Sequence, residues 1–538
     1  MRKIIYTIAL ICCGFLSTRG QVIYHVFERS FYDASGDGVG DLRGLRAQLG
    51  YLQRLGVTSI LLTPLYASAF YHNYFADDWE KIDPAYGTMQ DYLDLVRDIH
   101  SRGMKIYLDM ETQYVTDRHP WWGSAHILYD DSLHHKPSPI IWGITELKGY
   151  DGKVRKVAPV NLRDPEVLAY NERLFGFFAD PNGDGKFDDG VDGFRLDHTM
   201  DNLDGNPRLT ELFTHFWAPL LAALRQVNPS LAFVAEQANW ASFGFDYFTN
   251  ATVDQVFAFR LAMAIASFDK IQLTTAADTT LGMLPPGKEQ VVFLENHDMD
   301  RFASRVGMDP RKERVGAVLN LLLGGIPSIY YGQELGMTGV GGFNKYGNTD
   351  GNDIPRREAF EWYAADTGRG MALWYKGSGP WWDSTNLKPG DGISLEEELG
   401  NPASLWSWYR DLLALRTAHP GLSQGSYQTI SNTNGKVFSW ARVARGLTPE
   451  DGETVVGVVN LSGQTQLATL DLSGVVGPKG LRLRRIFGSA TGSASAAPAG
   501  GGAGASAVGN AGGAGATSQA GAFSVYLSPY SVGIWRML

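Results

Sequence analysis

Cysteine is almost absent from this chain of 538 residues, and the only two, Cys12 and Cys13, lie near the N-terminus. Both fall inside an apolar run, residues 4–16, that follows two basic residues. Such a run is too short to span a bilayer but is typical of the core of a signal peptide. We therefore expect residues 1–20 to be a signal peptide removed before Gln21, which leaves a mature chain that forms no disulfide.

A lipid anchor on one of the two cysteines is the alternative for this segment. The residue before the modified cysteine would then be Ile11 or Cys12, whereas such processing prefers a small residue there. No later segment is long and apolar enough to cross a membrane. The sequence therefore predicts an exported protein, secreted or periplasmic, in preference to a lipid-anchored one.

A basic surface is also lacking, since 47 Lys and Arg residues are outnumbered by 57 Asp and Glu residues and the net charge is -10. This balance argues against the basic patch that nucleic-acid binding requires. The composition, 44% apolar and 19% charged, is that of a soluble globular protein, which we expect to be a monomer. The chain is rich in tryptophan, with 14 residues whose flat faces suit sugar rings as well as core packing.

Short apolar or β-branched runs, each followed by a helix-like pattern, recur along most of the chain. This alternation is typical of βα units around a parallel sheet. Eight such runs are the number that closes a (β/α)8 TIM barrel, a fold of the α/β class. The expected strands are residues 22–28, 58–63, 104–109, 191–197, 231–236, 252–257, 291–295 and 326–330.

The spacing of these strands divides the chain into domains. We assign the barrel to residues 21–110 and 191–421, and a subdomain inserted after the third strand to residues 111–190. Alternating segments beyond residue 421 predict a C-terminal antiparallel β-sandwich domain, residues 422–538. Within it, residues 489–522 are almost wholly Gly, Ala and Ser, which predicts a flexible loop between two strands.

Ionisable side chains follow several of the expected strands. Because the C-terminal ends of barrel strands meet on one face, these side chains should converge there. Arg195 and Asp197 are two residues apart on one strand, so they point to the same side, and the Arg favours the ionised form that a nucleophile needs. One such acid would be explained by a helix cap, but three from different strands, with an Arg and a His, would not. The ionisable side chains at these strand ends are Asp109, Arg195, Asp197, Glu236, His297 and Asp298.

The motifs around these residues resemble those of the α-amylase superfamily, glycoside hydrolase family 13. They are VIYHVFERSFYD, GVTSILLTPLY, HNYFADDWEKIDPAYGT, GFRLD, AEQANW, FLENHD and GIPSIYYGQELGM, in the family's order and over roughly residues 22–420. The resemblance implies that Asp197 is the nucleophile, Glu236 the general acid/base and Asp298 the stabiliser of the transition state. His297, with Asp298, would hold sugar hydroxyls.

The same resemblance implies further contacts with the sugar. Tyr74 matches the family's stacking Tyr. Asp78 and Arg301 resemble the acid–Arg pair that closes the pocket in exo-acting and oligosaccharide-active members, with a surface ion pair as the alternative. His198, directly after the nucleophile, either lines the pocket or bonds to a loop.

Two acidic loops offer oxygen donors at alternate positions, with glycines for the turns, as cation-binding loops do. Neither ends in the Glu of an EF-hand loop, so the alternative is a turn-rich acidic loop without metal. Related family members carry a calcium or magnesium ion in the first loop, and we expect structural calcium in this chain. The expected ligands are Asp33, Ser35, Asp37, the Val39 carbonyl and Asp41 in the first loop, and Asp180, Asn182, Asp184 and Asp188 in the second.

The chain departs from the family pattern in two places. Gln113 and Tyr114 replace the usual Asn-His after the third strand, so a sugar contact must be lost or rebuilt. Met200 and Asp201 stand where endo-amylases carry Lys-His, which weakens the case for endo-action on long starch chains.

These motifs predict a retaining hydrolase that cleaves α-1,4-glucosidic bonds in starch-like α-glucans or maltooligosaccharides. The alternative within the family is an α-glucosidase, a cyclomaltodextrinase- or neopullulanase-like enzyme, or an α-glucan transglycosylase. A second alternative is a non-catalytic barrel that binds sugars or partners a transporter, but such relatives have typically lost catalytic acids that this chain keeps.

Overall fold

The computed structural model describes residues 20–365, 367–382, 390–445, 452–475, 481–494, 517–518 and 522–538. The expected signal peptide, apart from Gly20, and most of the expected flexible loop at 489–522 lie outside the described residues. Among the described residues, no helix combines the length and apolar character needed to cross a membrane.

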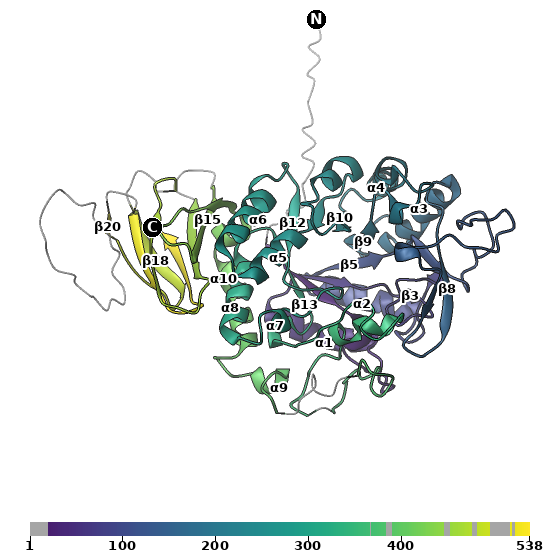
Figure 1. Ribbon diagram of the computed structural model, residues 1–538, viewed down its shortest axis with the longest axis horizontal. Helices are drawn as coiled ribbons and strands as arrows, with labels where there is room; N and C mark the ends of the chain where they lie inside the picture. The colour runs from purple at the N-terminus through teal and green to yellow at the C-terminus, as the bar shows by residue number, and fades with distance from the viewer. Residues whose placement is uncertain are drawn as a thin grey trace, which may run out of the picture.

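Eight parallel strands form a closed barrel in the middle of the molecule (Figure 1), which confirms the predicted TIM-barrel fold. They follow one another around the barrel in the order in which they occur in the sequence, and each overlaps a run that the sequence predicts. The strands are β1 (Ile23–Val26), β2 (Ser59–Leu62), β5 (Lys105–Met110), β9 (Gly193–Thr199), β10 (Ala232–Gln237), β11 (Gln255–Phe257), β12 (Glu289–Val292) and β13 (Ile326–Tyr330).

Helices surround the barrel, and several begin at a capping side chain. Asp41, Thr88 and Asp164 each accept a backbone N–H in the first turn of the helix that follows, which satisfies a donor that has no partner within the helix. The helices are α1 (Leu42–Leu55), α2 (Met89–Ser101), α3 (Pro165–Ala179), α4 (Ala218–Val227), α5 (Phe259–Ser267), α6 (Lys270–Gly282), α7 (Phe302–Arg305), α8 (Pro310–Leu322), α9 (Leu395–Glu398), α10 (Leu405–Ala418) and α11 (Pro420–Gln424).

Alternate residues of the strands fill the inside of the barrel. One apolar cluster there includes Ile23, Leu61, Tyr107, Val234, Val291 and Ile326. Gly193 belongs to the same layer, because a Cβ on it would lie 2.2 Å from the Ala232 carbonyl oxygen and 2.7 Å from the Tyr107 ring. Two and four residues further along β9, Arg195 and Asp197 point the same way as Gly193, towards the C-terminal end of the barrel.

The segment inserted after β5 contains a three-stranded antiparallel sheet in the order β6, β8, β7, at the right of Figure 1. Its strands are β6 (Tyr114–Thr116), β7 (Glu146–Lys148) and β8 (Val154–Pro159). The predicted range 111–190 also includes α3, which packs against the barrel helix α4. Before the insertion, β3 (Tyr66–Ala67) and β4 (Asp78–Ile82) pair in the connection that follows β2.

Two antiparallel sheets form the C-terminal domain at the left of Figure 1, which confirms the predicted β domain. They share an apolar core that includes Val456, Leu470, Val525 and Trp535. Part of the predicted 489–522 loop is strand, namely β19 and β20. The strands are β14 (Ser426–Thr429), β15 (Val437–Ala444), β16 (Glu453–Asn460), β17 (Gln466–Asp471), β18 (Leu481–Gly488), β19 (Thr491–Ala494), β20 (Thr517–Ser518), β21 (Ala522–Leu527) and β22 (Val532–Met537).

The C-terminal domain binds the end of α8. Trp440 Nε1, on β15, lies 3.3 Å from the Leu322 carbonyl oxygen, and Arg442 Nη1 lies 3.2 Å from that of Leu323. A helix leaves its last carbonyls without partners of its own, so these two side chains supply donors that α8 lacks.

Candidate active site

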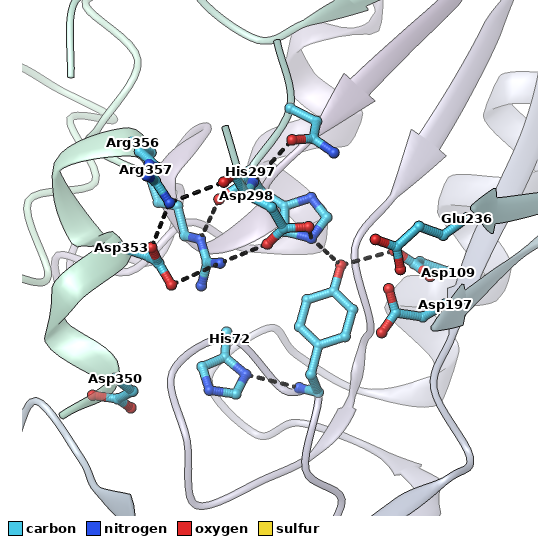
Figure 2. Close-up of polar contacts among 12 residues, drawn as sticks. His72, Asp109, Asp197, Glu236, His297, Asp298, Asp350, Asp353, Arg356 and Arg357 are labelled. Carbon is cyan, nitrogen blue, oxygen red and sulfur yellow. Dashed lines mark hydrogen bonds and ion pairs between the residues drawn. The ribbon is translucent and has the colours of Figure 1, made fainter. Parts of the chain in front are cut away.

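A cavity of about 480 Å³ opens at the C-terminal ends of the barrel strands. Most of the residues that the sequence predicts for catalysis and sugar binding lie around it, and the polar contacts among many of them are drawn in Figure 2. Those that line the cavity are Tyr74, Asp197, His198, Glu236, His297 and Asp298.

Arg195 joins the acids of three neighbouring strands. Its side chain is 1% exposed, its Nη1 lies 2.7 Å from Asp109 Oδ2 and contacts Asp197, and its Nη2 lies 3.4 Å from Glu236 Oε2. A buried cation favours the ionised form of the carboxylates that it contacts. Arg195 therefore gathers the predicted nucleophile and the predicted acid/base around one guanidinium.

Glu236 is held by a backbone donor as well. The His198 amide donates to Glu236 Oε2 at 2.8 Å, and His198 has a φ of 42°, in the left-handed region that few non-glycine residues adopt. Burial and the neighbouring Asp197 raise the pKa of Glu236 above its ordinary value. A raised pKa keeps the carboxyl protonated at a pH where an exposed Glu would be ionised, as a general acid requires.

Tyr74 and His297 form a stacked pair beside the acids, with ring centroids 5.2 Å apart. The Tyr74 hydroxyl donates to Asp109 Oδ2 at 2.8 Å and lies 2.8 Å from His297 Nε2. His297 Nε2 is also 3.1 Å from Asp298 Oδ2. Burial and the charge of Arg357 hold the pKa of His297 well below its ordinary value, so the ring is neutral. Burial raises the pKa of Asp298 to about 6.

Arg357 is a site residue that the sequence reasoning missed. Its Nη2 donates to Asp298 Oδ1 at 3.1 Å and its Nε to the His297 carbonyl at 2.9 Å, while Asp353 lies 3.7 Å away. Figure 2 places Arg357 and Asp353 across the site from Glu236. Arg357 follows the 3-10 helix η7 (Asp350–Arg356), well after the end of β13 in the sequence, so no strand-end pattern marks it.

The predicted pair between Asp78 and Arg301 is wrong. Asp78 bonds to Lys81 at 2.7 Å, and Arg301 bonds to Glu295 at 3.0 Å and lies over the Tyr330 ring. Arg301 is fully buried in the barrel wall, and neither member of the expected pair lines the cavity. Arg356 and Arg357 line the cavity instead, and Arg357 is the one that bonds to Asp298.

Of the two residues that replace the usual Asn-His, Gln113 bonds to the nucleophile strand and Tyr114 bonds to the loop after it. Gln113 Nε2 donates to the Asp197 carbonyl at 2.6 Å. The Tyr114 hydroxyl donates to Asp204 Oδ2 at 2.6 Å, and His198 Nε2 lies 3.0 Å from the other oxygen of that Asp. His198 therefore fills both roles that the sequence left open, because it lines the cavity and also bonds to a loop acid.

The first acidic loop bonds to itself. Asp33 Oδ1 accepts the Ser35 hydroxyl at 3.1 Å, Asp41 Oδ2 accepts the Ser35 amide at 2.9 Å, and Asp37 accepts the Val39 amide at 2.9 Å. These carboxylates are engaged with donors of the loop rather than directed at a common point.

The second acidic loop is arranged in the same way. Asp180 accepts the Gly185 amide at 2.9 Å, Asn182 accepts the Asp184 amide at 2.8 Å, and Asp188 is exposed. In the part of the chain that the structure describes, no three His, Cys, Asp or Glu side chains are grouped to hold a metal ion. The predicted ligands of both loops thus include side chains that bond to donors of their own loop, and no catalytic step depends on a metal ion at either loop.

Two exposed aromatic side chains lie at the rim of the cavity. Trp142, in the 3-10 helix η2 (Ile141–Gly143) of the inserted segment, is 69% exposed, and Phe343, in the loop after β13, is 68% exposed. Their ring centroids are 4.9 Å apart, and both residues line the cavity. Large apolar faces exposed beside a polar site are suited to binding a ligand with an apolar face of its own.

Comparison with known proteins gives the same family as the motifs. A family model described as the catalytic domain of alpha amylase matches residues 25–137 and 225–425, more than half of the chain. Alpha-amylase 3 of Dictyoglomus thermophilum is 28% identical over 445 residues, which cover 78% of this chain and 82% of that protein. The trehalose synthase/amylase of Mycobacterium tuberculosis is 28% identical over 522 residues, covering 84% of this chain and 83% of that protein.

A solved structure shares the fold of nearly the whole chain. The crystal structure of the alpha-amylase from H. orenii superposes with a TM-score of 0.73 and 24% identity, covering 96% of this chain and 99% of that one. The family model, the barrel and the acids at its C-terminal face agree. The chain therefore belongs to the α-amylase superfamily, family 13 of the glycoside hydrolases.

Proposed function

We propose that this protein is a retaining hydrolase that cleaves α-1,4-glucosidic bonds of starch-like glucans or maltooligosaccharides. The observation that supports this most is that Asp197 and Glu236 both reach the guanidinium of Arg195. Two acids on one guanidinium lie close together, and the retaining route needs carboxyls about 5 to 5.5 Å apart, whereas the inverting route needs roughly 6.5 to 9.5 Å.

The first step follows from the protonation states of the two acids. Glu236, whose pKa burial raises, donates its proton to the glycosidic oxygen. Asp197 attacks the anomeric carbon as the bond to that oxygen breaks, which gives a glycosyl ester on Asp197 and a free leaving sugar.

The second step reverses the proton transfer. Glu236, now ionised, takes a proton from a water molecule whose oxygen attacks the anomeric carbon and releases Asp197. Asp298, which Arg357 and His297 hold in place, stabilises the positive charge that develops on the sugar in both steps.

The stereochemistry of the product tests this mechanism. Proton NMR during hydrolysis of maltotriose should show the α-anomer of the new reducing end first, before mutarotation. The β-anomer as first product would exclude the retaining route. Asp197→Ala should remove hydrolysis, and an active Asp197→Ala enzyme would overturn the assignment of the nucleophile.

Action on oligosaccharides, or transfer in place of hydrolysis, is the second candidate. Met200 and Asp201 in place of Lys-His favour it, as does the similarity to a trehalose synthase/amylase. Product profiles over time on soluble starch, maltotriose, cyclodextrin and a nitrophenyl glucoside separate the candidates. Rapid loss of iodine staining with mixed oligosaccharides supports endo-action, whereas glucose as the sole product excludes it.

Export, a monomeric state and structural calcium remain part of the proposal. Gln21 is buried just before β1, so cleavage after Gly20 would leave the barrel strand complete. N-terminal sequencing of the protein from its native host should give Gln21 first, and an intact Met1 would exclude cleavage.

Light scattering should give the mass of one chain. Because we propose that the acidic loops hold calcium, EDTA should lower the melting temperature.

A further inference from the structure

Glu111 is a further carboxyl of the site, and the proposed reaction does not use it. It directly follows β5, two residues after Asp109. Its backbone is fixed, because its carbonyl accepts the Tyr66 hydroxyl at 2.7 Å and Trp79 Nε1 at 3.0 Å. The residue lines the cavity but is only 1% exposed.

The side chain of Glu111 lies between a backbone donor and the nucleophile. Its Oε1 accepts the Gln113 amide at 2.7 Å, and its carboxyl is hydrogen-bonded to that of Asp197. Two carboxyl groups can share a hydrogen bond only if one of them carries a proton. Asp197 contacts Arg195, which favours its ionised form, so the proton belongs on Glu111.

The surroundings of Glu111 agree with this assignment. Burial and the charges of Asp197 and Asp109 raise the pKa of Glu111 well above its ordinary value. The other titratable groups that face it are the phenols of Tyr66 and Tyr114. Asp197 and Asp109 disfavour a second negative charge at this point, and with burial they outweigh the Gln113 amide, whose hydrogen bond lowers the pKa of Glu111.

Gln113 bonds to the backbone of β9, the strand that carries Asp197. Its Nε2 donates to the Asp197 carbonyl at 2.6 Å and lies 3.4 Å from that of His198. The oxygen of its side-chain amide accepts the Thr112 backbone N–H at 2.7 Å. Residues 111–113 therefore contact the nucleophile twice, once at its side chain and once at its main chain.

We propose that Glu111 is a positioning residue for the nucleophile, which donates a hydrogen bond from its protonated carboxyl to Asp197 and holds that carboxylate in line with the anomeric carbon. This inference rests on the proposed function, since it assigns Glu111 to the attack by Asp197. Glu111 keeps its proton throughout, so the proton balance of the two steps is unchanged.

Two substitutions of nearly equal volume test the donated hydrogen bond. Glu111→Gln keeps a donor at this position, and Glu111→Met removes it. We expect kcat of Glu111→Gln to stay within about threefold of wild type, and kcat of Glu111→Met to fall roughly 10- to 100-fold, as misplacement of a reacting group does. KM should change little in either variant, because Glu111 acts through Asp197.

Melting temperatures of both variants separate positioning from folding. A folded Glu111→Met enzyme with wild-type kcat would overturn the proposal, and so would a folded Glu111→Gln enzyme that has lost more than about 30-fold. The second result is decisive even if Glu111→Met does not fold. Wild type and Asp197→Ala are assayed in parallel: an inactive wild type, or an active Asp197→Ala, rejects the proposed function instead.

Discussion

Two arginines contact the three catalytic acids of the site. Arg195 contacts Asp197 and Glu236, and Arg357 contacts Asp298. Glu236 nevertheless has a raised pKa, because burial and the charge of Asp197 outweigh the effect of Arg195. Burial, together with the charge of Asp197, therefore makes Glu236 the acid that donates a proton.

His198 provides a test of this balance. Burial lowers its pKa, but the bond to Asp204 and the nearby acids outweigh that effect and raise it, and the resulting positive charge lowers the pKa of Glu236. His198→Gln should therefore raise the pKa of Glu236 and move the alkaline limb of the kcat/KM profile to higher pH. His135→Gln, an exposed position away from the cavity, should leave the profile unchanged. A shift to lower pH would contradict the assignment.

The elements of the barrel could be read from the sequence, and the loops could not. Barrel strands are buried on both faces, so each is an apolar run, and the acids of β9 and β10 lie where those runs end. Arg357 carries no such pattern, because its place depends on how the chain after β13 folds over the barrel. Glu111 does follow a strand end, but its contact with Asp197 shows only in the folded chain. The pairing of Asp78 with Arg301 failed for a related reason: a resemblance of motifs does not show that Arg301 turns into the barrel wall.

The loops at the rim give a prediction about chain length. Trp142→Ala should raise KM for maltopentaose by roughly 5- to 20-fold and leave that for a nitrophenyl glucoside within about twofold, because a second sugar would lose an aromatic face. Leu133→Ala is the matched control, since Leu133 is 71% exposed in the same inserted segment and does not line the cavity. Equal effects on both substrates would show that the rim does not bind the longer chain.

At the scale of the whole molecule, buried acids outside the active site make stability depend on pH. Glu334 is fully buried and accepts the Tyr24 hydroxyl at 2.6 Å, and burial raises its pKa to about 7. Its ordinary value is about 4.5, so the folded state binds the proton more tightly than the unfolded one. The resulting stability is fully present below about pH 4.5 and is lost as the pH rises through about 7.

Calorimetry between pH 5 and pH 9 tests this dependence. The melting temperature should fall as the pH rises through the neutral range, and Glu334→Gln should make that fall smaller because one buried titrating group is gone. Glu146→Gln, at an exposed position on β7, should follow wild type. A steeper fall in Glu334→Gln would show that the sign is wrong.

The contact between barrel and C-terminal domain gives a second prediction for the whole molecule. Arg442→Met should lower the free energy of unfolding by about 1 to 3 kcal/mol, because the Leu323 carbonyl at the end of α8 loses a donor. Arg445→Met, an exposed neighbour, should change it by less than about 0.5 kcal/mol. Chemical denaturation measures both, and equal values for the two variants would count against the docking role of Arg442.

The same contact bears on the order of events during synthesis. Helix α8, which lies between β12 and β13, leaves the ribosome about 120 residues before Trp440 and Arg442. At about 5 to 20 residues per second, its carbonyls wait roughly 6 to 24 s for their donors. A nascent barrel is therefore incomplete at this end for seconds, and chaperones that act on emerging chains have that interval in which to bind it.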